Sequence, residues 1–158
     1  EEGLFLRSSI KVNTVMVALK KILKAGLYFD FKKEKAYAEE YVKKLHTATS
    51  SVNKRVMFLS GGNQQKVIFG KWLEREPKVF MMDEPTRGID VGAKYEIYDL
   101  IIQMAKQGKT IIVVSSEMPE ILGITNRIGV MSNGRLAGIV NTKETNQEEL
   151  LRLSAKYL

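Results

Sequence analysis

The chain has 158 residues, of which 44% are hydrophobic and 27% are charged, as is typical of a globular protein with a core of its own. It has no cysteine and a single histidine, His46, which excludes a disulfide framework and any metal site built from thiolates or several imidazoles. No apolar run approaches the ~20 residues that span a bilayer. The net charge of +7 is compatible with a nucleic-acid or anionic-membrane partner, but the basic residues are scattered along predicted helical faces and aromatic residues do not alternate with them, which favours a solvated surface rich in lysine.

The first 58 residues are rich in Lys and Glu and are predicted to be mostly helical. Apolar residues recur at helical spacing from Val12 to Ala25, where Gly26 provides a stop, and again from Lys33 to His46. His46 is expected to be an exposed residue of this second helix. The polar segment from Thr47 to Lys54 predicts a loop.

From residue 59 onward, helical and strand patterns alternate, and this order predicts an α/β fold with a parallel sheet. Asn133-Gly134 between the last two strands predicts a tight hairpin. Helices are predicted at Asn63 to Glu74, Val91 to Lys106, Met118 to Leu122 and Gln147 to Tyr157 (capped by Asn146), and strands at Val79 to Met82, Thr110 to Val114, Ile128 to Ser132 and Arg135 to Val140.

Two carboxylates follow the predicted strand from Val79 to Met82, whose continuous apolar run indicates a buried strand. Asp83 and Glu84 would then lie at the carboxyl edge of a parallel sheet, where open α/β folds bind ligands. Asp83 can hold Mg²⁺ through water, and Glu84 can orient a water for attack on a γ-phosphate. Taken alone, the pair is equally compatible with an ordinary strand end before the turn at Pro85.

The segment from Leu59 to Lys66 reads Leu-Ser-Gly-Gly-Asn-Gln-Gln-Lys. Its glycines allow a close approach of the backbone to a ligand, and its helix start offers free N–H groups to an anion. Ser60 and Gly62 could therefore grip a terminal phosphate. The simpler interpretation is a Ser-Gly-Gly turn that caps a helix.

These two motifs, together with Thr86-Arg87-Gly88-Ile89-Asp90 after the carboxylates, resemble the ABC ATPase cassette, in which signature motif, Walker B and D-loop follow in this order. The chain looks most like the second cassette of the tandem ATPases that power import of galactose, ribose and related sugars, and within them the galactose/methyl galactoside branch. The stretches that carry this likeness are Leu59 to Lys66, Asp83 to Lys94, Val114 to Glu120, Glu149 to Leu153 and the opening Gly3 to Phe5.

The resemblance implies a P-loop NTPase-like parallel sheet preceded by an α-helical subdomain. Residues 1–58 would form that subdomain and contact membrane-spanning permease subunits, and residues 59–158 would carry signature, Walker B, D-loop and the C-terminal part of the ATPase core. It also implies ATP and Mg²⁺ as cofactors, a periplasmic or extracellular sugar-binding protein as a further partner, and a location at the cytoplasmic face of the cell membrane. No nucleic-acid partner is expected.

In the family, two cassettes dimerise head to tail, so each signature faces the ATP of the other cassette. The resemblance therefore places Asp90 at the interface between cassettes. Asn63 stands where most families have Gln, which is a usual departure in the sugar-importer branch. By the same resemblance, the residues that complete the partner's ATP site are Ser60, Gly61, Gly62 and Gln64.

A phosphate-binding Gly-x-x-x-x-Gly-Lys-Ser/Thr loop is missing from the sequence. Gly108-Lys109-Thr110 is the nearest candidate, but position 103 is Gln and the tripeptide leads from helix into strand, so we predict a turn there. The sequence does not begin with Met, and we expect a fragment whose Walker A loop, adenine-stacking strand and Q-loop lie upstream. Such a fragment would be inactive alone and would self-associate through exposed faces of its two parallel strands.

The switch position of the family, usually His, is Ser116 in this chain. A serine cannot act as a protonatable switch, so the ATP site around this cassette's own Asp83 and Glu84 is expected to be weak or inactive. The alternatives are a cassette of another ABC system, such as an exporter or a chromosome-maintenance ATPase, and a basic non-enzymatic nucleic-acid-binding module. The former would show long coiled coils if it served chromosomes, and the latter would bind DNA tightly and in a salt-sensitive way.

Overall fold

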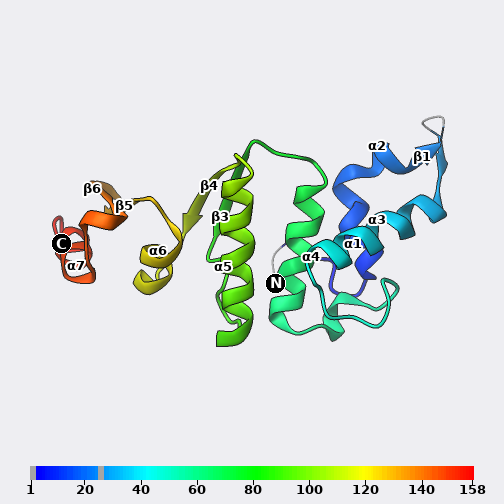
Figure 1. Ribbon diagram of the computed structural model, residues 1–158, viewed down its shortest axis with the longest axis horizontal. Helices are drawn as coiled ribbons and strands as arrows, with labels where there is room; N and C mark the ends of the chain where they lie inside the picture. The colour runs from blue at the N-terminus through cyan, green and yellow to red at the C-terminus, as the bar shows by residue number, and fades with distance from the viewer. Residues whose placement is uncertain (1–2, 25–26) are drawn as a thin grey trace. The chain divides into compact units, whose positions relative to one another are not determined.

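A computed structural model describes residues 3–24 and 27–158 (Figure 1). They form two compact units. The first, here called the helical unit, lies within Glu1–Phe80 and Thr86–Thr110, and the second, the C-terminal unit, comprises Met81–Pro85 and Ile111–Leu158. This division does not fall at residue 58, and the assignment of residues 1–58 to a helical subdomain remains a prediction.

The helical unit opens with three short helical segments, α1 (Ile10–Val15), η1 (Met16–Ala18) and α2 (Leu19–Ile22). The Ser9 side chain caps α1 by accepting from the Val12 N–H. The helical structure predicted from Val12 is confirmed as far as Ile22, in three segments, but the prediction is wrong beyond Ile22, where the chain leaves the helix. Leu23–Lys24 (β1) instead pairs antiparallel with Tyr28–Phe29 (β2). The predicted stop at Gly26 lies outside the described residues.

Helix α3 (Phe31–Lys44) confirms the second predicted helix. Asp30 caps it, with Oδ1 accepting from the N–H groups of Lys32 and Lys33 at 3.1 Å each. His46 is exposed, as predicted, but it lies beyond the helix, with a positive φ of 49°. Left-handed residues of this kind commonly close helices.

Helix α4 (Gly61–Leu73) follows a loop and the short η2 (Val56–Phe58). It begins two residues earlier than predicted, because both glycines join the helix. A cluster of buried apolar side chains, Ile10, Val56, Leu59 and Val67, joins α1, the preceding loop and α4. Helix α1 also packs against α3, so α4 is held on a defined helical base.

Strands β3 (Val79–Asp83) and β4 (Thr110–Val114) form a two-stranded sheet. Hydrogen bonds from Thr110 N to the Lys78 carbonyl (3.0 Å) and from Glu84 N to the Val114 carbonyl (2.8 Å) show that the strands run parallel. The predicted burial of β3 is wrong for one of its faces. Val79 and Met81 are 51% and 78% exposed, because among the described residues no further strand or helix covers them.

Helix α5 (Val91–Lys106) has the predicted bounds, and Gly108 turns the chain toward β4 with φ +85°. The Gly-Lys-Thr segment is therefore a helix-to-strand turn, as predicted. Helices that alternate with a parallel strand pair confirm the predicted α/β class.

The C-terminal unit continues with α6 (Met118–Ile124), β5 (Arg127–Ser132), β6 (Arg135–Asn141), η3 (Thr142–Glu144) and α7 (Gln147–Ser154). Strands β5 and β6 form the predicted antiparallel hairpin, and positive φ at both Asn133 and Gly134 gives the twist that such two-residue turns need. Asn146 caps α7 as predicted, but the helix ends three residues early. The core of the C-terminal unit contains the buried side chains of Ile128, Val130 and Leu150.

Candidate functional site

The start of helix α4 carries the predicted signature serine. Ser60 is exposed at the N-cap position with an extended backbone, and its side chain makes no capping hydrogen bond to the helix backbone. Its Oγ instead accepts from Asn63 Nδ2 at 2.8 Å. The first N–H groups of a 13-residue helix and one hydroxyl thus face outward together, which is the arrangement that binds anions.

The two signature glycines have different surroundings. A Cβ built on Gly61 would lie 3.5 Å from the Gly88 carbonyl oxygen, an ordinary contact, and Gly61 is exposed. A Cβ on Gly62 would lie 2.6 Å from Cβ of Ala93, far inside van der Waals distance. Gly62 therefore permits the close crossing of α4 and α5. Gly61 is exposed, and its lack of a side chain leaves the main chain of the turn accessible.

Gln64 lies within α4 and is half-buried. Its Nε2 donates to the Leu59 carbonyl at 3.1 Å and to the Val56 carbonyl at 3.3 Å. The amide thus braces the turn that presents Ser60. The contact of Gln64 with a partner's ATP, implied by the resemblance, stays a prediction.

Lys66 was not identified from the sequence, yet it ties the signature helix to its neighbours. Its Nζ lies 2.7 Å from Glu96 Oε2 and donates to the His46 carbonyl at 2.9 Å, and its side chain is only 7% exposed. A buried lysine needs such partners, because burial without them is costly. Only the buried position in the fold distinguishes Lys66 from the many surface lysines.

The D-loop segment leads into α5. Gly88 has a positive φ of 73°, and the Ile89 N–H donates to the Thr86 carbonyl at 3.2 Å, which closes a tight turn. Asp90 is exposed and caps α5, with Oδ1 accepting from the Ala93 N–H at 2.9 Å. Its predicted place at an interface between cassettes is compatible with this exposure and stays a prediction.

In the C-terminal unit, the predicted catalytic residues meet at the ends of two strands. Glu84 adopts the left-handed region with φ 45°, which is rare for a residue of this type. Its Oε1 accepts from the Ser116 N–H at 2.9 Å. The residue at the switch position thus holds the carboxylate through its main chain, a contact that does not depend on the serine side chain.

Asp83 is exposed at the end of β3. In the part of the chain that the structure describes, no group of three or more His, Cys, Asp or Glu side chains could hold a metal by itself. A single exposed carboxylate is a ligand that a hard, largely hydrated Mg²⁺ ion can accept through water, and this role of Asp83 stays a prediction.

The clearest pKa shifts fall away from these residues. Burial, helped by a hydrogen bond to Glu74, raises the pKa of the Tyr41 phenol. Burial also lowers the pKa of Lys71, whose Nζ donates to the Gly3 carbonyl at 2.8 Å. Both groups lie within the helical unit, Tyr41 on α3 and Lys71 in the last turn of α4, and we assign them structural roles.

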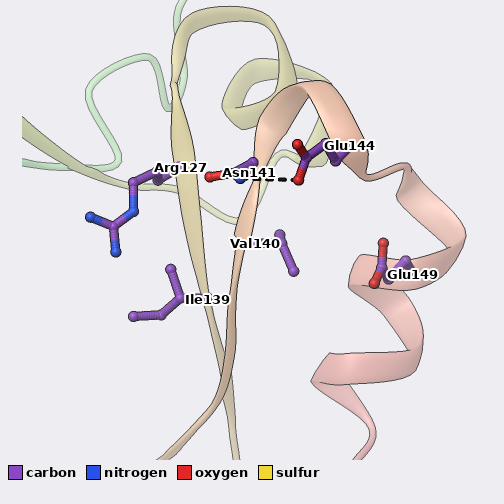
Figure 2. Close-up of a pocket in the computed structure, with 6 residues that line it drawn as sticks. All are labelled: Arg127, Ile139, Val140, Asn141, Glu144 and Glu149. Atoms are coloured by element: carbon purple, nitrogen blue, oxygen red, sulfur yellow. Dashed lines mark hydrogen bonds between the residues drawn. The ribbon is translucent and has the colours of Figure 1, made fainter.

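A hollow of about 380 Å³ lies on the β5–β6 hairpin beside α7 (Figure 2). Arg127 and Ile139 project from the hairpin, and Glu149 comes from α7 (Figure 2). Asn141 Nδ2 donates to Glu144 Oε2 at 3.0 Å at its rim. Glu149 belongs to one of the stretches that carry the family likeness, but none of the predicted site residues lines this hollow, so it is separate from the candidate site.

Across residues 3–24 and 27–158, no helix combines the length and the apolar character needed to cross a membrane.

Comparison with known proteins places these features in a family. The family model described as "ABC transporter" matches residues 2–87, which is more than half of the chain. Solved structures share the fold. A dimeric ATP-binding cassette in a post-hydrolysis state bound to ADP and Pi aligns with a TM-score of 0.73 at 21% identity, covering 88% of this chain and 59% of the other.

Curated relatives are much more similar in sequence. The galactose/methyl galactoside import ATP-binding protein MglA of Treponema denticola is 65% identical over 156 residues, and that of Pasteurella multocida is 52% identical over 157 residues. Each alignment covers 99% of this chain but 31% of the relative. The chain thus spans about a third of the length of the curated relatives it matches. The ordered signature, Walker B and D-loop segments, the α/β fold and the family match lead to one conclusion: this chain belongs to the ABC transporter family.

Proposed function

We propose that the chain is part of the ATP-binding subunit of an ABC importer, coupling ATP hydrolysis to uptake of galactose, methyl galactoside or a related monosaccharide. The observation that carries the proposal is the signature turn, where Ser60 and Gly61 are exposed at a helix start that Gly62 anchors on α5. The names of the relatives, at up to 65% identity, support the choice of sugar.

The signature turn would act on ATP held by another cassette. The Ser60 hydroxyl and the first N–H groups of α4 would donate to its terminal phosphate, where a helix start favours negative charge. The exposed Asp90 would border the same interface. Because Gly62 packs on Ala93, the turn is held in place before the nucleotide arrives.

The C-terminal unit would supply the residues of this cassette's own ATP site. Asp83 would hold Mg²⁺ through water, and Glu84 would orient a water molecule while the Ser116 N–H fixes its carboxylate. When bound, the magnesium ion supplies charge neutralisation on the transferring phosphoryl group. With serine at the switch position, this site is the weaker of the two.

The proposed partners follow from the family. They are a second ATPase cassette in a head-to-tail dimer, membrane-spanning permease subunits contacted by residues 1–58, and a periplasmic or extracellular sugar-binding protein. The proposed location is the cytoplasmic face of the cell membrane, as a peripheral subunit.

The test compares variants of the complete importer ATPase. We expect Ser60→Arg to lower ATP turnover and galactose uptake by roughly 100-fold, in the range reported for loss of preorganised donors, and to lower them more than Glu84→Gln does. Gln107→Arg, which introduces the same side chain at an exposed position after the last turn of α5, is the control and leaves both unchanged. Equal or reversed losses would show that the site of Glu84 is the active one, and turnover without galactose stimulation would contradict the sugar assignment.

A further inference from the structure

Asn63 lies one turn behind the signature serine, and both ends of its side-chain amide are engaged. Its Nδ2 donates to Ser60 Oγ at 2.8 Å. Its Oδ1 accepts from the main-chain N–H of Ala48 at 2.6 Å. Ala48 belongs to the loop after α3, so the amide connects this loop to the signature turn.

The Ala48 contact fixes the orientation of the amide. A main-chain N–H can only donate, so the atom of Asn63 that faces it must be the carbonyl oxygen. The NH₂ group is thereby directed at Ser60. With an unanchored asparagine the two ends of the amide would be interchangeable, and the serine would meet either a donor or an acceptor.

The orientation of the amide decides what Ser60 can do. Because an amide NH₂ only donates, Ser60 Oγ accepts from Asn63, and the hydroxyl proton is left for another acceptor. The serine side chain makes no capping bond to the helix, so it leaves the first N–H groups of α4 available as donors beside its own hydroxyl. An anionic phosphate oxygen is the acceptor that such a set of donors fits.

We propose that Asn63 is a positioning residue that keeps the Ser60 hydroxyl a hydrogen-bond donor toward the phosphate of ATP held by the opposing cassette. This inference rests on the proposed function of the signature turn. Asn63 acts through Ser60 and makes no contact with the nucleotide in this role. This role explains why residue 63 is an asparagine: one end of its short amide accepts from Ala48 and the other end donates to Ser60.

The sharpest variant is Asn63→Asp, because aspartate has the same shape and retains the acceptor for Ala48. It replaces the donor to Ser60 with a second acceptor, which captures the hydroxyl proton. We expect kcat for ATP in the complete importer ATPase to fall at least tenfold with little change in KM, as for an interaction made mainly in the transition state. Hydrogen exchange of the Ala48 amide stays slow in this variant and becomes faster in Asn63→Ala.

A double-mutant cycle with Ser60→Ala separates positioning from other effects. If Asn63 acts through Ser60, Asn63→Ala costs about tenfold in kcat in the parent and almost nothing once Ser60 is Ala. Asn63→Asp likewise costs less in the Ser60→Ala background than in the parent, since only its charge remains to act. Additive losses in both cycles, or normal turnover in Asn63→Asp with an intact Ala48 contact, would overturn the inference. If Ser60→Ala itself leaves turnover unchanged, the proposed function of the signature turn has failed instead.

Discussion

Gly61 and Gly62 are adjacent, yet the structure gives each its own reason to lack a side chain. Gly62 faces α5 at a distance that a methyl group cannot occupy, whereas a methyl group on Gly61 would make ordinary contacts with Gly88 and Ile89. The first is required by the packing of two helices. The second is required, under the proposed function, by the approach of a phosphate group to the turn.

Alanine substitutions at the two positions should therefore change the free energy of unfolding differently. Gly62→Ala is expected to lower the free energy of unfolding by about 1–3 kcal/mol, because an added methyl would overlap Ala93. Gly61→Ala is expected to leave it unchanged or to raise it by up to ~1 kcal/mol, since alanine favours a helix. Urea unfolding of both variants measures the difference, and equal stabilities would contradict the packing argument.

Single residues also show where sequence reasoning stops. The positions of Ser60, Asp83, Glu84 and Ser116 followed from motifs, and the structure brings Glu84 and Ser116 into contact. The contacts of Asn63, Gln64 and Lys66 did not follow, because they are made with main-chain groups that precede α4 and, for Lys66, also with the Glu96 side chain, and no local pattern identifies these neighbours.

At the scale of elements, the spacing of apolar residues predicted helices and strands best where turn residues mark both ends of the element. Helix α5 and strand β4 have the predicted bounds, and Asn133-Gly134 forms the predicted turn. The helical prediction from Val12 onward holds as far as Ile22 and fails beyond it, because the backbone of Leu23 and Lys24 pairs with β2 instead. A short hairpin overrode the helical spacing there.

Helix α5 illustrates how one side chain can serve both an element and a site. Asp90 caps the helix, so its removal affects stability whether or not the residue also meets another cassette. We expect Asp90→Ala to lower the free energy of unfolding by about 1 kcal/mol and Asp90→Asn to leave it nearly unchanged, since asparagine caps equally well.

ATP turnover of the complete ATPase then isolates the second role. A fall in turnover for Asp90→Asn, with unchanged thermal stability, would place the carboxylate in the interface between cassettes. Unchanged turnover in Asp90→Asn would restrict Asp90 to capping α5.

At the scale of the whole molecule, one face of the β3–β4 sheet is apolar and exposed. Met81 is 78% exposed, and Ile112 and Val114 on β4 are 46% and 57% exposed. Alternate residues of a strand share a face, so Ile112 and Val114 form part of one apolar surface. Sequence reasoning anticipated the exposure of these strands, although the same apolar run had also indicated a buried strand.

We predict that the 158-residue chain self-associates through this surface, because exposed apolar strands promote association. Met81→Lys should shift the chain toward monomer in light scattering at high concentration. Leu27→Lys is the matched control, since Leu27 is 81% exposed but lies in the β1–β2 turn. A clean monomer in the parent chain, or an equal effect of both substitutions, would contradict the prediction.

The close crossing of α4 and α5 has a consequence for recognition. Gly62 on Ala93 and the pair Lys66–Glu96 lock the signature turn and the start of α5 into one body. A molecule that docks against Ser60 therefore meets Asp90 at a fixed distance, and the rotational and translational entropy of association is lost once for both contacts rather than separately for each. The helix crossing thus lets two short motifs behave as a single binding epitope.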